Sequence, residues 1–338
     1  MTDRYYYYLL NADCRILYDR LLDGIKKRCD KVLCKDLSVC IDDVPLIISA
    51  VEYDNPDLFY VDFSKSQFCY SNESKKASSI SIEYLYSVTD TFALQAIVDS
   101  SCKAIISKTS IVGCSDLQKL WKVHDFLIDN VDYFQEVLTQ KGSFEWYRAS
   151  SILGLFLDKK AICSGISRAL KYILNQIGLR AIVVAGFAID QNNKKVGHEW
   201  NIVSISGKKY HLDMTWDITE SVGTLRSYNY FNLNDELIFK DHYTDSVLPE
   251  CKDNDENYFE RKGAVIHGKK DWVRYFNTSH DRLIGDYYVR FTYPCDLNHE
   301  VKRIEELIVN RRKITGIINL QSLINERQSI VRVVVKNG

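Results

Sequence analysis

The feature that most constrains this chain is an amphipathic stretch followed closely by strand-like segments, between residues 163 and 216. From Cys163 to Ile177 the apolar residues recur at the spacing of one helix face, and Gly178 stands where a glycine helix cap belongs. Runs rich in β-branched and aromatic residues follow at 181–189, 198–205 and 209–216, separated by polar turns. This order predicts a helix packed against an antiparallel meander, with Cys163 at the N-terminus of the helix.

Three side chains of this stretch form a candidate nucleophilic triad. Free backbone N–H groups and the helix dipole favour the thiolate form of a cysteine at a helix N-terminus. If the last two strands pair through a turn with an even number of residues, His198 and Asp213 project from the same sheet face as direct or diagonal neighbours. An imidazole held by a carboxylate can act as the general base for a thiol. The pattern therefore predicts a Cys163-His198-Asp213 triad.

Composition argues against several classes of function. The chain has 338 residues, and its 44 Lys and Arg against 45 Asp and Glu give a net charge of -1, so we expect neither nucleic acid nor membrane as a partner. No stretch is apolar enough for a signal peptide or a membrane span. The ten scattered cysteines are interpreted as reduced thiols, which favours a cytoplasmic location. Cys29, Cys34 and Cys40 lack zinc-site spacing, and we expect no metal and no cofactor.

The pattern of elements divides the chain into three regions. They are an N-terminal α+β region at 1–112, a catalytic core at 113–250 that opens with a helix after Ser115, and a C-terminal α/β region at 251–338. In the first region we expect helices at 11–30 and 42–53 and strands at 58–62, 67–70 and 79–88. In the last we expect strands at 286–293 and 329–336 and a helix from 298.

Three segments resemble the motifs of the transglutaminase-like superfamily. They read Ala-Ile-Cys-Ser-Gly-Ile-Ser at 161–167, Gly-His-Glu-Trp-Asn at 197–201 and Tyr-His-Leu-Asp-Met-Thr-Trp-Asp at 210–217. The resemblance implies an α+β fold with a papain-like transglutaminase core, in which an N-terminal catalytic-Cys helix packs on an antiparallel β-sheet, with additional α/β regions at both ends. It also implies that Cys163 is the nucleophile, His198 the general base and acid, and Asp213 the residue that orients the histidine.

The activity implied by the resemblance is that of a cysteine peptidase or amidase acting on a peptide or protein substrate through an acyl-enzyme. Bacterial members of the family are generally regarded as proteases, and the chain has no calcium-loop pattern. Two alternatives stay open: an acyl transferase that accepts an amine and crosslinks proteins, and a non-catalytic protein-interaction module on the same fold.

Several further residues are expected near the site. The supporting or pocket residues are Ser164, Gly165, Trp200, Asn201 and Trp216. Trp200 shares a sheet face with His198 and is expected to shield the imidazole or to form a substrate wall, whereas Trp216 is interpreted as a core aromatic. The backbone N–H of Cys163 or Ser164 is the candidate oxyanion donor.

Other positions carry weaker expectations. Ile166 and Leu153 stand where the family often has aromatics, and we expect them at the pocket. His211 lies on the face of Asp213 and would complete a two-His-one-carboxylate metal site with His198, an alternative that leaves the position of Cys163 unexplained. The remaining histidines, interpreted as surface or capping residues without evident partners, are His124, His242, His267, His280 and His299. The segment 230–251 resembles one that follows the core in many bacterial members, and we expect a structural role for it.

Overall fold

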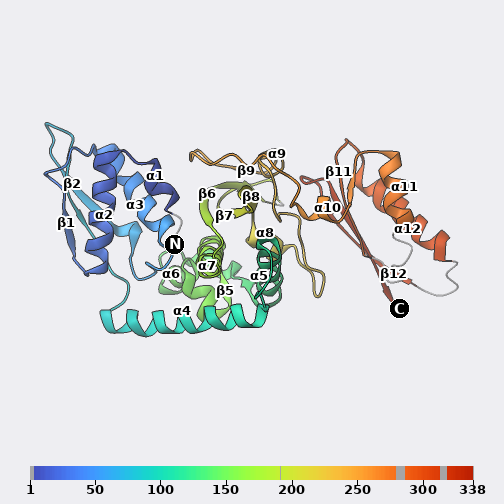
Figure 1. Ribbon diagram of the computed structural model, residues 1–338, viewed down its shortest axis with the longest axis horizontal. Helices are drawn as coiled ribbons and strands as arrows, with labels where there is room; N and C mark the ends of the chain where they lie inside the picture. The colour runs from blue at the N-terminus through green and yellow to red at the C-terminus, as the bar shows by residue number, and fades with distance from the viewer. Residues whose placement is uncertain (1–3, 191, 279–285, 313–317, 338) are drawn as a thin grey trace.

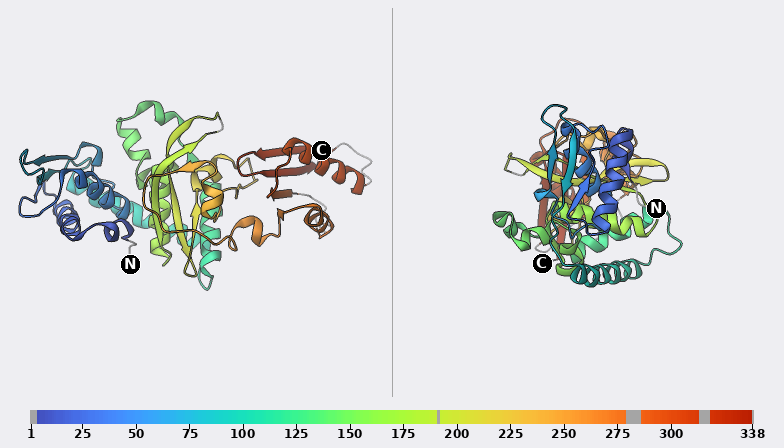
Figure 2. Two further views of the ribbon diagram at one scale, coloured as in Figure 1. Left: turned by 90° about the horizontal axis from the view of Figure 1, so that it is seen from above. Right: turned by 90° about the vertical axis from the view of Figure 1, so that its left-hand side faces the viewer.

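The computed structural model describes residues 4–190, 192–278, 286–312 and 318–337. The molecule is elongated, with the N-terminal helices at one end, a central sheet, and a second sheet near the C-terminus at the other end (Figures 1 and 2). Helices and strands are mixed throughout. Among the described residues, no helix has both the length and the apolar character that crossing a membrane requires.

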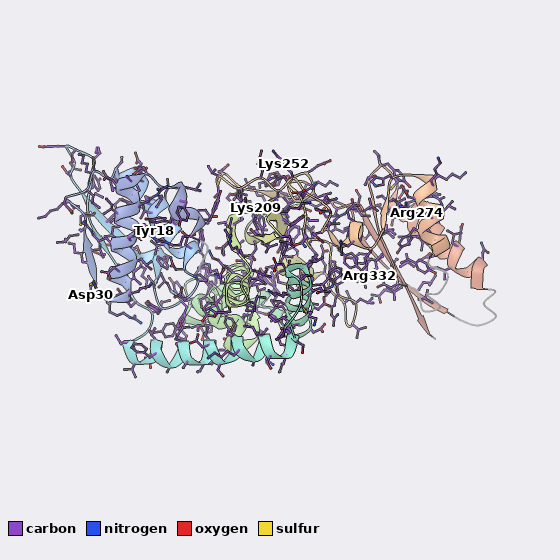
Figure 3. The ribbon with its side chains drawn as sticks, viewed as in Figure 1. Tyr18, Asp30, Lys209, Lys252, Arg274 and Arg332 are labelled. Carbon is purple, nitrogen blue, oxygen red and sulfur yellow. The ribbon has the colours of Figure 1, made fainter. Side chains whose placement is uncertain are left out.

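The N-terminal part packs three helices against a small antiparallel sheet of order β1-β3-β2. Its elements are α1 (Tyr5–Leu9), α2 (Ala12–Lys26), β1 (Lys31–Leu33), η1 (Ile41–Asp43), α3 (Val44–Asp54), η2 (Phe63–Lys65), β2 (Gln67–Tyr70) and β3 (Ala77–Ser81). Tyr18, labelled in Figure 3, is fully buried among them. The helices expected at 11–30 and 42–53 and the strand at 67–70 are confirmed. The prediction of a strand at 58–62 is wrong, because that segment forms only an isolated bridge between Val61 and Tyr84. The strand predicted at 79–88 is confirmed only at 79–81, within β3, and Val88 begins a helix.

A long helix that the sequence did not predict, α4 (Val88–Thr109), runs beneath both the N-terminal part and the centre (Figure 1). Its Val98 and Cys102 are buried in the main hydrophobic cluster, together with residues of the central helices. Phe92 and Ile97 on other faces are exposed. Because apolar residues occur on both buried and exposed faces, this helix lacks the clean periodicity that identifies a helix from sequence.

The centre contains the helix and meander that the sequence predicts. Its elements are α5 (Asp116–Asn130), β4 (Asp132–Tyr133), η3 (Gln135–Gln140), α6 (Phe144–Ala149), η4 (Gly154–Asp158), β5 (Lys160–Ala161), α7 (Cys163–Gln176), β6 (Ala181–Ile189), β7 (Lys195–Ile205), β8 (Lys208–Leu212), α8 (Met214–Thr219), α9 (Asp235–Ile238) and β9 (His242–Tyr243). Helix α7 packs on β6 and β7 of an antiparallel sheet of order β8-β7-β6-β9. One boundary was predicted wrongly, because β8 ends at Leu212 and Asp213 caps α8 instead of lying in a strand.

The C-terminal part is a four-stranded sheet of order β10-β11-β13-β12 with helices beside it. Its elements are α10 (Tyr258–Arg261), β10 (Val265–Ile266), α11 (Lys269–Thr278), β11 (Asp286–Phe291), α12 (Leu297–Arg312), β12 (Ile318–Asn325) and β13 (Ile330–Asn337). Strand β12 was not predicted. Arg332 of β13, labelled in Figure 3, joins this sheet to the centre by donating to the Arg226 carbonyl at 2.7 Å. The turn between β12 and β13 also reaches the central sheet, where Arg327 donates to Asn193 at 2.6 Å.

Candidate active site

A cleft of about 1600 Å³ opens beside the start of α7. Cys163, His198 and Trp216 line it from the centre, and Asn325 at the end of β12 and Arg327 in the turn that follows line it from the C-terminal part. The structure therefore brings two of the three proposed triad side chains to one cleft, and a distant part of the chain forms one of its walls.

Cys163 is the first residue of α7 and is half-buried. The residue before it, Ile162, has no side chain that caps the helix, so N–H groups of the first turn stay available to another acceptor. Gly165 allows this turn to lie against α6, because a Cβ at that position would stand 2.2 Å from the carbonyl oxygen of Ala149. Ser164 lines the cleft directly after the cysteine.

His198 and Asp213 are joined by a hydrogen bond of 2.6 Å between Nε2 and the carboxylate Oδ2. The turn between β7 and β8 holds two residues, and the pairing of Asn201 with Leu212 makes positions 198 and 213 diagonal neighbours. Only 6% of the His198 surface is exposed, and burial alone would lower the pKa of this imidazole. The negative charge of Asp213 and, after it, the sulfur of Cys163 outweigh burial and raise the pKa of His198 to about 10.

Asp213 is fully buried, and each of its oxygens has a separate task. Oδ1 accepts backbone N–H groups of Thr215 at 3.0 Å and Trp216 at 3.2 Å, which caps α8. Oδ2 accepts from His198 and also contacts Nε2 of His242 at 3.0 Å. Burial would raise the pKa of Asp213, but His198 and then His242 hold it below its usual value.

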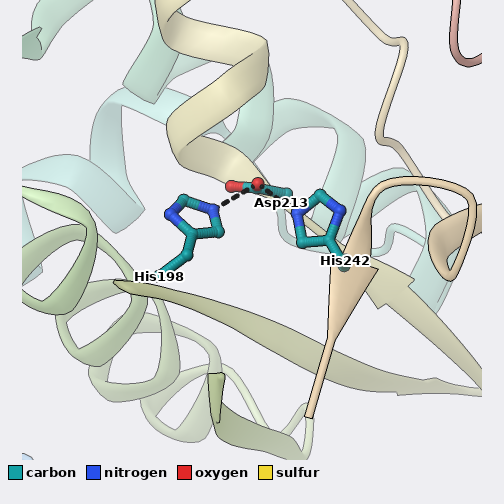
Figure 4. Close-up of side chains that lie close together, drawn as sticks. All are labelled: His198, Asp213 and His242. Atoms are coloured by element: carbon teal, nitrogen blue, oxygen red, sulfur yellow. Dashed lines mark hydrogen bonds and ion pairs between the residues drawn. The ribbon is translucent and has the colours of Figure 1, made fainter. Parts of the chain in front are cut away.

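His242 is the side chain of the site that sequence reasoning missed (Figure 4). It lies on β9, is fully buried, and contacts Asp241 through Nδ1 at 2.6 Å as well as Asp213 through Nε2. The segment 230–251 thus supplies a neighbour of the triad in addition to packing. The prediction that His242 and His124 lack partners was wrong, because His124 is also buried and lies 2.9 Å from Asp217. His280 lies outside the described residues.

His211 does not join His198 and Asp213, contrary to the metal-site alternative. The indole N–H of Trp200 donates to Nδ1 of His211 at 3.0 Å. Because Trp Nε1 can only donate, Nδ1 must accept, and the ring proton lies on Nε2, which faces Asp235 at 2.9 Å. Burial also lowers the pKa of His211. This histidine is therefore a neutral link between a buried indole and a carboxylate.

Within the part of the chain that the structure describes, two groups of side chains hold metal-ligand atoms within 4.8 Å of one another. They are His198, Asp213 and His242, and His211, Asp235 and Cys251. In the first group the nitrogen–oxygen distances are 2.6 and 3.0 Å, shorter than the separation of about 3.3 Å between ligand atoms of a tetrahedral zinc site. Such distances are those of hydrogen bonds, so shared protons account for this contact.

The structure selects one of the two roles expected for Trp200 and moves Trp216 from the core to the cleft. Trp200 is fully buried on the same sheet face as His198, with its ring stacked at 6.3 Å from the imidazole, so it shields the imidazole and forms no substrate wall. Trp216 lines the cleft with its ring centroid 5.4 Å from that of His198. Asn201 is fully buried and donates to the carbonyls of Ser167 and Ile182, which ties α7 to the sheet.

The expectation that Ile166 and Leu153 line the pocket was wrong. Both are fully buried in the main hydrophobic cluster. Neither residue is among those that line the cleft. An aliphatic side chain at either position therefore affects the packing of the core.

No protein-family model matches the chain. The curated protein Kyphoscoliosis peptidase from Mus musculus is 23% identical over 176 residues, which cover 48% of this chain and 26% of that protein, so the chain spans about a quarter of this relative.

Among solved structures, a TGase matches with a TM-score of 0.32 at 15% identity, over 45% of this chain and 44% of the other. A candidate cysteine protease from Cytophaga hutchinsonii matches with a TM-score of 0.28 at 12% identity, over 45% and 61%. Both scores are too low to establish a shared fold. The three motifs at 161–167, 197–201 and 210–217 resemble those of the transglutaminase-like superfamily, and the chain is similar to the mouse peptidase over about half of its length.

Proposed function

We propose that the chain is a thiol enzyme that hydrolyses amide bonds of peptide or protein substrates through an acyl-enzyme on Cys163. The observation that carries this proposal is a buried imidazole, His198, placed between Asp213 and the Cys163 sulfur at the edge of a large cleft. The packing of α7 on an antiparallel sheet supports a papain-like transglutaminase core. We also propose that the chain is organised in three regions, namely an N-terminal region at 1–112, a catalytic core at 113–250 and a C-terminal region at 251–338. The proposed location of the protein is the cytoplasm.

The hydrogen bonds of His198 define the route of the proton. Nε2 is occupied by Asp213, so Nδ1 is the ring nitrogen left to face Cys163. Nδ1 takes the thiol proton, and the sulfur attacks the substrate carbonyl carbon. When the carbon–nitrogen bond breaks, Nδ1 gives the proton to the leaving amine. Water, activated by the same nitrogen, then releases the acid and restores the thiol. Release by an amine instead of water would make the same site a transferase.

The first turn of α7 is the proposed oxyanion site. The negative oxygen that forms during attack on a carbonyl needs donors that are fixed in advance. The N–H groups of Cys163 and Ser164 meet this need, since the helix has no side-chain cap at Ile162. Trp216 covers one side of the imidazole and so limits the access of water to the His198–Asp213 bond.

The experiment that tests this proposal is alkylation with iodoacetamide at pH 6, followed by peptide mapping of all ten cysteines. We expect Cys163 to be modified first, because it begins a helix and its sulfur interacts with the imidazole of His198, a setting typical of reactive cysteines. Cys69 is a control within the same chain, since it is more exposed than Cys163. The same reaction on His198→Ala should remove the difference. If Cys69 reacts as fast as Cys163 in the unaltered protein, the site is not activated, and the non-catalytic interaction module becomes the better reading.

A further inference from the structure

His242 lies between two carboxylates, and this position is unlike that of any other described histidine of the site. Its Nε2 stands 3.0 Å from Oδ2 of Asp213 and its Nδ1 stands 2.6 Å from Oδ1 of Asp241. The imidazole is fully buried, so water replaces neither contact. Both ring nitrogens therefore face atoms that accept hydrogen bonds.

The other bonds of the two carboxylates indicate where the protons lie. Oδ2 of Asp241 accepts from the Tyr230 hydroxyl at 3.0 Å and from Nε2 of Gln328 at 2.9 Å. Asp213 accepts two backbone N–H groups and the N–H of His198. Each carboxylate thus receives donors that stabilise its ionised form, and an ionised carboxylate only accepts. His242 satisfies both contacts only when both of its nitrogens carry a proton, that is, as an imidazolium.

From this arrangement we propose that His242, held by Asp241, is a positively charged positioning residue of the active site. It donates the fourth hydrogen bond to Asp213 and so keeps this carboxylate ionised and oriented toward His198. The inference rests on the proposed function, because it assigns a task within the same triad. Cys163, His198, Asp213, His242 and Asp241 then form one row in which negative and positive groups alternate.

A buried carboxylate explains the need for this second cation. Asp213 has no exposed surface, and an ionised group in such a place is costly unless all of its acceptor positions are used. Two backbone bonds and the two imidazoles fill them. Among the effects on the pKa of Asp213, His242 acts in the same direction as His198, toward a lower value.

The neighbours of His242 come from several elements. The titratable groups that face it or its carboxylate partners are Tyr133 of β4, His198 of β7, His211 of β8, Asp213 before α8, Glu220 after α8, Tyr230 and Asp241. His211 is neutral, as its bond with Trp200 requires. Its influence on the charge of His242 is therefore small, and the two aspartates and His198 dominate the field.

The test is the pH profile of Cys163 alkylation in His242→Gln. The Gln amide N–H can replace the donor toward Asp213 but carries no charge. Without the positive charge, Asp213 takes up a proton at higher pH and the thiolate of Cys163 is less stabilised. We expect the acid edge of the alkylation plateau to move up by about one pH unit, the scale of one nearby buried charge. His124→Gln is the matched control, since it also removes a buried imidazole that is bonded to Asp217 and lies 3.7 Å from Asp125, and we expect it to leave the edge unchanged.

The outcomes separate this inference from the proposed function. If the unaltered protein shows no plateau below pH 7, the proposed function fails. If the plateau is present and His242→Gln leaves its edge within about 0.3 pH units, His242 carries no charge and the inference is overturned. Should His242→Gln not fold, nitrogen-15 NMR of the histidine rings of the unaltered protein at pH 7.5 decides the question. Two protonated ring nitrogens on His242 support the inference, and a single one refutes it.

Discussion

Replacing Asp213 by Asn separates the two tasks of this residue. Asn is as good an N-cap as Asp, so its Oδ1 can keep the bonds to Thr215 and Trp216 that begin α8. At the Oδ2 position, however, the amide presents N–H groups toward the imidazole of His198 and has no negative charge. The ring then receives a donor where it had an acceptor, which forces the proton to Nδ1, the nitrogen that must accept from Cys163.

The size of the effect follows from the pKa of His198. Burial lowers this pKa, but Asp213 first and Cys163 second raise it from 6.5 to about 10. At about 1.4 kcal/mol per pKa unit, a shift of this size corresponds to on the order of 4–5 kcal/mol of stabilisation, most of which needs the Asp213 charge. Because the folded-state pKa is raised, this stabilisation is fully present below pH 6.5 and is lost as the pH rises toward 10. A comparable change in a catalytic triad costs about 10⁴-fold in turnover.

Urea unfolding of the unaltered protein and of Asp213→Asn at pH 6, 8 and 10 measures this directly. The difference in unfolding free energy should be largest at pH 6 and should shrink steadily toward pH 10. Alkylation of Cys163 at pH 6 should fall at least 100-fold in the variant. A stability difference that stays constant from pH 6 to pH 10 would refute the idea that the charge of Asp213 raises the pKa of His198.

Two further substitutions test the walls of the cleft. Burial raises the pKa of Glu220 to about 8, so the protonated form that stabilises the fold is lost between pH 4.5 and 8. Glu220→Gln, which cannot ionise, should therefore raise the unfolding free energy at pH 8 by roughly 1–3 kcal/mol and leave it unchanged at pH 4. Melting curves at both pH values measure this difference. A Cβ on Gly186 would stand 2.2 Å from the carbonyl oxygen of Tyr243, so Gly186→Ala should cost about 1–3 kcal/mol by forcing β9 away from β6. Gly197→Ala, where the Cβ meets nothing within 4 Å, is the control for stability, and equal losses in both variants would contradict this account.

The parts of the structure that sequence patterns predicted are those that local rules determine. Helix α7 follows from apolar residues on one face and from Gly178, whose positive φ of 81° suits a helix end. The contact between His198 and Asp213 follows from a two-residue turn, Ser206 and Gly207, which fixes the register of β7 and β8. Asp213 itself was misplaced by one element, because an Asp after a strand and before a helix serves equally as a strand residue or as an N-cap.

His242 could not be found in this way, because its contacts depend on the return of the chain across β6. Strand β9 pairs with β6 through only Phe187 and Ala188, and a pairing of two residues leaves no periodic signal. The sequence did contain one local signal, the pair Asp241-His242, in which a carboxylate stands beside an imidazole. A second signal was Gly186 within β6, because a glycine in a strand allows another backbone, here that of Tyr243 in β9, to approach closely.

The same return explains why a segment expected only to support the core takes part in the site. Tyr230 and Gln328 come from different regions, yet both donate to Oδ2 of Asp241. Asp241 holds His242, which in turn contacts Asp213. A hydrogen-bonded row therefore runs from the turn between β12 and β13 to the proposed base. Displacing that turn would remove the Gln328 donor from Asp241, and this row of hydrogen bonds gives the C-terminal sheet a direct contact with the partners of Asp213.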